Sequence, residues 1–124
     1  MNINEYSPLV LAYLGDCVIE LAAREKLVKS GNIPPEHLHE KALYFVTASN
    51  QSKAVENILP LLSETETEIY KRGRNAKSRV PKSASAIDYR RATGMECLFG
   101  YLYLCENDKR IKELFDIAFG DVEI

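Results

Sequence analysis

The sequence predicts an all-α protein with one domain over residues 1–124. Three observations support this: apolar residues recur at steps of three and four, capping residues or prolines precede most of these runs, and no stretch alternates with the period of a strand. A chain of 124 residues has the size of one domain with one core. Its 46% hydrophobic and 27% charged residues are ordinary for a globular protein.

The first three predicted helices follow local start and stop signals. The first, over 8–29, has a serine cap and a proline at its first position, and Ser-Gly-Asn ends it. Pro34-Pro35 opens the second helix, which carries apolar residues at helical spacing. We expect a bend near residues 48–50 and then a third helix that includes residues 54–62.

The second half of the chain predicts three more helices and one loop. They are, in order, a helix ending near Gly73 behind the capping box Ser63–Glu66, an exposed loop over 74–84, a helix over 85–105, and a last helix that begins at Asn107 or Asp108.

Asp16 is an anomaly in the first helix, because the surrounding residues 9–21 are almost all apolar. A charge within an apolar surface is costly to bury unless it is paired. By itself, this aspartate fits a structural role, such as bonding a buried arginine or a helix end, as well as it fits a role at a site.

Glu96 is a second acid near a core-facing surface. It lies at the edge of the apolar stripe of the helix over 85–105, between Gly94 and Gly100, and such small residues favour close approach by another backbone or a ligand. An acid at the edge of a stripe is more often exposed than a ligand. If Asp16 and Glu96 meet, they remain ionised together only around a cation, and oxygen ligands favour Mg²⁺ or Mn²⁺.

The basic segment, defined as residues 71–91, points to a polyanion although the net charge of the chain is −2. It holds half of the chain's 16 lysines and arginines and one acid, Asp88. A basic loop is commonly a solvated surface. Together with an acid pair and a metal ion, however, it suggests hydrolysis of a phosphodiester.

Two motifs carry a resemblance to a known family. Leu14-Gly15-Asp16-Cys17-Val18 resembles the nuclease signature of the ribonuclease III family, and the stretch 93–100 resembles its second motif around the catalytic glutamate. The resemblance covers about Pro8 to Leu104 and is similar in particular to the short branch, mini-ribonuclease III, which lacks the double-stranded RNA-binding domain that usually follows. It implies a ribonuclease III-like helical bundle, working as a homodimer, with Asp16 and Glu96 as catalytic metal ligands.

The resemblance also identifies departures from the wider family. Two further signature acids would fall at Leu9 and Ala12, and another at Thr93, and this chain has none of them. The short branch is similar in lacking the acid at Ala12 and in having threonine before glycine. A further family acid would fall near Glu36, so the number of metal ions and a role for Glu36 remain open.

What the resemblance implies about function is specific. It implies a Mg²⁺-dependent endoribonuclease that cuts double-stranded RNA, leaves 5′-phosphate and 3′-hydroxyl ends, and takes part in maturation of 23S ribosomal RNA. Tyr13 falls where many members have an aromatic that packs into the partner subunit; a core tyrosine of the same chain is an equal alternative. In such an enzyme the RNA-binding residues would be Arg72, Arg74, Asn75, Lys77, Arg79 and Lys82. Arg90 and Arg91 stay undecided.

Two other functions stay open. One is a non-catalytic RNA-binding or ribosome-associated protein on the same fold, against which the retention of Asp16 and Glu96 argues. The other is a helical, Mg²⁺-dependent nucleotide pyrophosphatase, whose clustered acids are absent around these two residues. Three cysteines without C-x-x-C spacing predict neither a disulfide framework nor a zinc site, and we expect a cytoplasmic protein without a membrane span.

Overall fold

The computed structural model describes residues 2–83, 85–120 and 122, and residue 84 of the predicted loop lies outside them. Within the described residues the structure is helical and has no strand, which confirms the all-α prediction. The elements are η1 (Ile3–Glu5), α1 (Pro8–Ser30), α2 (Pro35–Val46), α3 (Ala48–Ile58), η2 (Leu59–Leu61), α4 (Glu64–Arg74), α5 (Ala86–Leu104) and α6 (Asp108–Ala118). No helix in these ranges is both long and apolar enough to cross a membrane.

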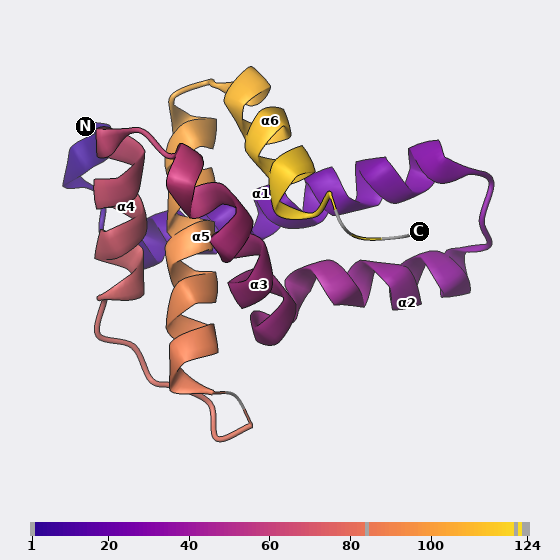
Figure 1. Cartoon of the computed structure of the whole chain (residues 1–124), viewed down its shortest axis with the longest axis horizontal. Coiled ribbons are helices and arrows are strands. Elements are labelled where there is room, and N and C mark those ends of the chain that lie inside the picture. The colour runs from indigo at the N-terminus through magenta and orange to yellow at the C-terminus, as the bar shows by residue number, and fades with distance from the viewer. Residues whose placement is uncertain (1, 84, 121, 123–124) are drawn as a thin grey trace.

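Helix α5 is the centre of the structure, and it contacts α1, α3, α4 and α6. Figure 1 shows α5 with α4 beside it, while α1 crosses it and continues to pair with α2 as a hairpin that extends to one side. The α4–α5 connection lies at the end of the bundle where α5 begins. The middle of the basic segment is therefore placed at that end.

The predicted helix starts are confirmed because they depend on local hydrogen bonds. The Ser7 side chain accepts from the Leu9 backbone N–H at 3.2 Å. Ser63 and Glu66 form the expected reciprocal capping box, with distances of 3.1 and 2.9 Å. Asn107, one of the two predicted caps of the last helix, accepts from the backbone N–H of Arg110 at 3.2 Å.

The predicted boundaries differ from the structure at both ends of α3. The break before α3 falls at Thr47, and the Asn50 side chain reinforces it by donating to the Tyr44 carbonyl at 3.1 Å and to the Thr47 hydroxyl at 2.7 Å. The predicted extension to residue 62 is wrong, because α3 ends at Ile58 and η2 follows. Pro60 lies in that turn, and proline offers no N–H to continue an α-helical ladder.

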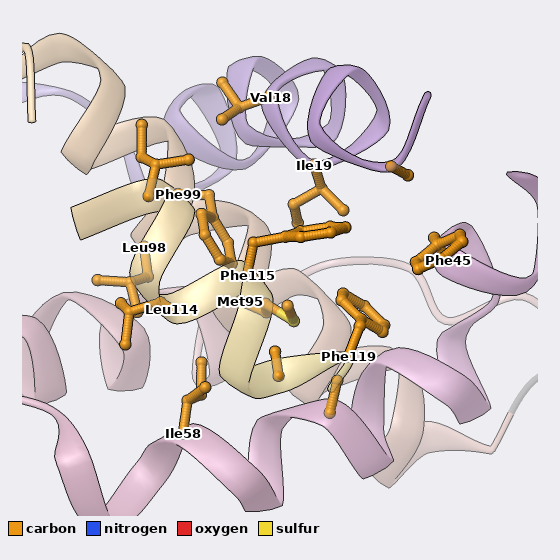
Figure 2. Close-up of a cluster of buried hydrophobic side chains, with 14 of the residues drawn as sticks. Val18, Ile19, Phe45, Ile58, Met95, Leu98, Phe99, Leu114, Phe115 and Phe119 are labelled. Carbon is orange, nitrogen blue, oxygen red and sulfur yellow. The ribbon is translucent and has the colours of Figure 1, made fainter. Parts of the chain in front are cut away.

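The main core lies between α5 and the helices around it (Figure 2). Phe45 from α2 stacks on Phe115 from α6, with ring centroids 5.8 Å apart. Phe119 meets both rings, at 5.1 Å from Phe45 and 5.0 Å from Phe115. These aromatic contacts join the α1–α2 hairpin to the end of the chain, so the hairpin is part of the same hydrophobic unit.

A nearly buried ion pair joins α4 to α6. Arg110 donates from Nε and Nη2 to the two carboxylate oxygens of Glu66, at 2.8 and 2.7 Å, and Nη2 also donates to the Leu61 carbonyl at 2.9 Å. Hydrogen bonding from Arg110 lowers the pKa of Glu66 from its ordinary value of 4.5, although burial alone would raise it. The pair closes the bundle on the side opposite the basic end of α5.

Glu66→Gln is expected to lower the free energy of unfolding by about 2 kcal/mol at pH 7, because it removes the charge-assisted hydrogen bonds from Arg110 and leaves Glu113 of the same helix as its remaining ion-pair partner. The pKa of Glu66 is lowered in the folded state, so this stabilisation is present above the ordinary pKa near 4.5 and is lost as the pH falls below it. Urea unfolding at pH 7 and at pH 3.5 measures both effects. The exposed pair Glu25–Lys29 provides the control, since Glu25→Gln should leave the stability nearly unchanged at both pH values.

Candidate active site

The candidate active site lies where α1 crosses α5 at backbone contact. A Cβ atom placed on Gly15 would be 1.6 Å from the Glu96 carbonyl oxygen, and one on Gly100 would be 2.0 Å from the Leu11 carbonyl oxygen. Only glycine permits this approach. The expectation of close backbone approach at Gly100 is confirmed, whereas the role of Gly15 was missed; a glycine inside an otherwise apolar helix was its only signal.

The crossing brings together Asp16 of α1 and Glu96 of α5, which are 80 residues apart in the sequence. Asp16 is exposed and Glu96 is half-buried. Burial raises the pKa of Glu96 to about 8, and the adjacent Asp16 carboxylate adds charge repulsion and a hydrogen bond that favour the protonated acid. Two carboxylates are thus held close enough to disfavour a second negative charge, which is the electrostatic condition that attracts a cation.

No third metal-ligand side chain joins this pair. Among residues 2–83, 85–120 and 122, no group of three or more His, Cys, Asp or Glu residues could hold an ion. Ala12 is buried, Leu9 is partly exposed, and the Thr93 hydroxyl donates to the Tyr89 carbonyl at 3.0 Å. Glu36 is exposed in the first turn of α2, where a carboxylate favours the helix dipole.

The basic segment covers the end of α4, the connection, and the start of α5. Some of its predicted RNA-binding residues already bond to the protein. Arg72 is half-buried and donates to the Tyr6 carbonyl at 3.2 Å, which ties α4 to the N-terminal turn. Arg74 donates to the Asn75 side chain at 3.1 Å. Asn75, the C-cap of α4, is exposed.

The remaining basic side chains differ in whether they are exposed or paired with an acid. Lys77, Arg79 and Lys82 are exposed, and none of them pairs with an acid within the part of the chain that the structure describes. Arg91 forms an ion pair with Glu56 of α3 at 3.1 Å, whereas Arg90 is exposed. Of these two arginines, Arg91 is the one that pairs with an acid of the same chain.

Tyr13 lies on an exposed apolar face of α1. Its side chain is 83% exposed, so its interpretation as a core tyrosine of the same chain is wrong. Val10, at 53%, and Leu21, at 65%, are exposed on the same helix. Exposed apolar side chains gathered on one helix are typical of a surface that contacts another molecule. This face lies beside Asp16 in the same helix.

The geometry defines a class of protein: a helical domain with two facing carboxylates at a helix crossing and a basic segment leading into the helix that carries one of them. That combination suits phosphodiester chemistry on a polyanion. Comparisons with known proteins give the particular family. The model of the ribonuclease III domain matches residues 9–107.

Similar proteins extend over nearly the whole chain. A mini-ribonuclease 3 from Brevibacillus brevis is 44% identical over 121 residues, which are 97% of this chain and 90% of that protein. A mini-ribonuclease 3 from Streptococcus pneumoniae is 36% identical over 99% of this chain and 98% of that protein. A crystal structure of a protein from Fusobacterium nucleatum superposes with a TM-score of 0.85 at 32% identity, covering 97% of this chain and 98% of that one.

The chain belongs to the ribonuclease III family, whose members are endoribonucleases that act on double-stranded RNA, and its relatives are of the short, mini-ribonuclease III branch. The resemblance found in the motifs around Asp16 and Glu96 is thereby confirmed for the family. The match to residues 9–107 includes both motifs and the basic segment.

Proposed function

We propose that this chain is a Mg²⁺-dependent endoribonuclease that uses Asp16 and Glu96 to hydrolyse phosphodiester bonds of duplex RNA. The observation that carries the proposal is the convergence of these two carboxylates at the α1–α5 crossing, where the pKa of Glu96 is raised to about 8. Within the residues that the structure describes, neither carboxylate forms an ion pair with a lysine or arginine. Family membership supports the substrate class.

The donor set fits magnesium. Mg²⁺ is commonly held by one or two carboxylates and keeps several waters, so a site with two acids and open surroundings is sufficient. Asp16 and Glu96 would hold it, and Mn²⁺ would be accepted by the same oxygens. When bound, the ion supplies an activated water and stabilises the charge that develops on the phosphoryl oxygens. Because Leu9, Ala12 and Thr93 stand where the wider family has acids, Asp16 and Glu96 would supply the carboxylate ligands alone.

The basic segment would hold the duplex over this site. Lys77, Arg79 and Lys82 are exposed and available to phosphates, while Arg74 and Asn75 lie at the end of α4 beside them. Arg72 would act less directly, since it bonds the Tyr6 carbonyl. Contacts to phosphates position a duplex without reading its sequence, and the deep, narrow major groove of A-form RNA keeps side chains from the base edges there.

The second strand requires a second active site, which a homodimer would supply. The exposed apolar face around Tyr13 is the surface that supports this, because it is next to Asp16 in α1 and pairing it with another copy would bury it. Two copies also double the number of phosphate contacts, and with them the salt sensitivity of binding.

The physiological substrate we propose is the precursor of 23S ribosomal RNA, in the cytoplasm. The relatives carry the name mini-ribonuclease 3, and the branch resemblance implies this maturation step. Three free cysteines, Cys17, Cys97 and Cys105, agree with a reducing compartment.

Incubation with a long RNA duplex and Mg²⁺ tests the activity. Wild-type protein should cut the duplex to fragments with 5′-phosphate and 3′-hydroxyl ends, and it should leave single-stranded RNA and duplex DNA intact. Tight duplex binding without cleavage would favour the non-catalytic RNA-binding alternative. Turnover of nucleoside triphosphates in place of RNA cleavage would favour a pyrophosphatase.

Magnesium should also stabilise the folded protein, and this is measurable without RNA. At about ten times its dissociation constant, a ligand that binds only the native state adds about 1.4 kcal/mol to the free energy of unfolding. Asp16→Asn and Glu96→Gln should each lose this gain in urea unfolding with and without Mg²⁺, whereas Glu25→Gln, elsewhere on α1, should keep it. Equal stabilisation of all four proteins would place the ion elsewhere.

A further inference from the structure

We propose that the hydroxyl of Tyr89 hydrogen-bonds a ribose 2′-hydroxyl beside the scissile phosphate and so helps the site to select RNA duplexes over DNA duplexes. The inference rests on the proposed function. It adds a specificity residue to a site whose other contacts are with phosphate.

The first support is the position of Tyr89 on α5. It precedes Glu96 by seven residues in an uninterrupted helix, which places the two about 10 Å apart along the axis and within about 20° around it. Tyr89 also comes one turn after Ser85, where the connection from α4 ends. It therefore stands on the face that carries Glu96, between the acid pair and the exposed lysines and arginines of the connection.

The second support is that the Tyr89 hydroxyl is available. The side chain is half-buried, yet in the described part of the chain its hydroxyl makes no hydrogen bond. Every buried side-chain polar atom among the same residues has a partner, so this unbonded oxygen is one that reaches solvent. Because the ring is half-buried, the side chain has few alternative positions, so the hydroxyl can be offered to a substrate at a small cost in side-chain entropy.

The third support comes from the neighbouring hydroxyls, which are engaged. Between the start of α5 and Glu96, the Ser85 hydroxyl accepts from the Asp88 backbone N–H at 3.3 Å. The Thr93 hydroxyl donates to the Tyr89 carbonyl at 3.0 Å. Tyr89 is then the neutral hydroxyl of this stretch that remains free to donate to, or accept from, a substrate.

Discrimination of RNA from DNA needs such a group. Lysine and arginine bind the phosphates of both duplexes, and the bases of an A-form helix are poorly accessible in its deep groove. The 2′-hydroxyl is the feature that distinguishes the two sugars, and it both donates and accepts. A phenol can match either role.

A chemical double-mutant cycle tests the contact. A short RNA duplex with one mapped cleavage site is prepared in versions that each carry a single 2′-deoxynucleotide near that site. Tyr89→Phe should lower kcat/KM on the all-RNA duplex about fivefold, the effect of one neutral hydrogen bond. One deoxy position should lower the wild-type value by the same factor and leave Tyr89→Phe unaffected.

Tyr44→Phe is the matched control, because Tyr44 is an exposed tyrosine on α2; it should show no coupling to any deoxy position. Unchanged activity of Tyr89→Phe would overturn the inference. Additive losses at every position would overturn it too, including losses caused by misfolding, which lower all substrates alike. If the wild-type protein cleaves no RNA duplex, the proposed function fails first and this inference fails with it.

Discussion

Replacing Asp16 by asparagine or Glu96 by glutamine is expected to lower the rate of duplex cleavage by at least about 10³-fold. Either change removes one of the two charges that the α1–α5 crossing brings together, and the chain offers no third acid nearby within its described residues to replace it. Single-turnover cleavage with saturating protein and Mg²⁺ measures the chemical step without a contribution from binding.

Three control measurements accompany this prediction. Duplex binding should survive in both variants, because the exposed Lys77, Arg79 and Lys82 are untouched. The double variant should be no slower than either single variant, since residues that act as one unit are not additive. Glu25→Gln should cleave at the wild-type rate, as its carboxylate pairs with Lys29. Substantial cleavage by both Asp16→Asn and Glu96→Gln would contradict the site.

Features that depend on a few consecutive residues could be predicted from the sequence. The serine cap before Pro8, the capping box from Ser63 to Glu66 and the cap at Asn107 each use side chains within three residues of the bonds they make. The helix boundaries they define were therefore correct to within a residue. The end of α3 was missed because apolar spacing continues past Pro60 although the hydrogen-bonded ladder does not.

Features that depend on contacts between distant residues could not be derived in the same way. The apolar neighbours of Asp16 and the helical spacing around Glu96 suggested that both acids lie on or near core-facing surfaces, whereas Asp16 is exposed. Their meeting required the crossing at Gly15 and Gly100. Only the resemblance to a family with both motifs connected them beforehand. Tyr13 was equally compatible with the core and with a partner, because its packing depends on which side of α1 the other helices occupy.

The charge pattern of the sequence also overestimates how many basic side chains are free to bind phosphate. Eight basic residues in the basic segment suggested one phosphate-binding unit, whereas the structure uses Arg72 to hold the Tyr6 carbonyl and Arg91 to hold Glu56. Arg72 is 66 residues from Tyr6 in the sequence, and Arg91 is 35 residues from Glu56. No local pattern therefore distinguishes a structural arginine from one that faces solvent.

The second large effect is expected from Gly15→Ala, which should lower the free energy of unfolding by about 4 kcal/mol or more. The new methyl group would lie 1.6 Å from the Glu96 carbonyl oxygen and 2.9 Å from the Gly100 backbone nitrogen. Both are backbone atoms of α5, so no side-chain rotation relieves the overlap and the two helices must separate. Gly100→Ala should act in the same way through the Leu11 carbonyl oxygen, at 2.0 Å.

Urea unfolding measures the loss, and Gly31→Ala is the matched control, since no atom lies within 4 Å of a Cβ there. That substitution should cost only about 1 kcal/mol, from its positive φ. Because Glu96 itself forms the contact with Gly15, separation of the helices also moves its carboxylate from Asp16. Any folded fraction of Gly15→Ala should therefore bind Mg²⁺ poorly, whereas wild-type stability with intact Mg²⁺ binding would contradict a backbone contact at this crossing.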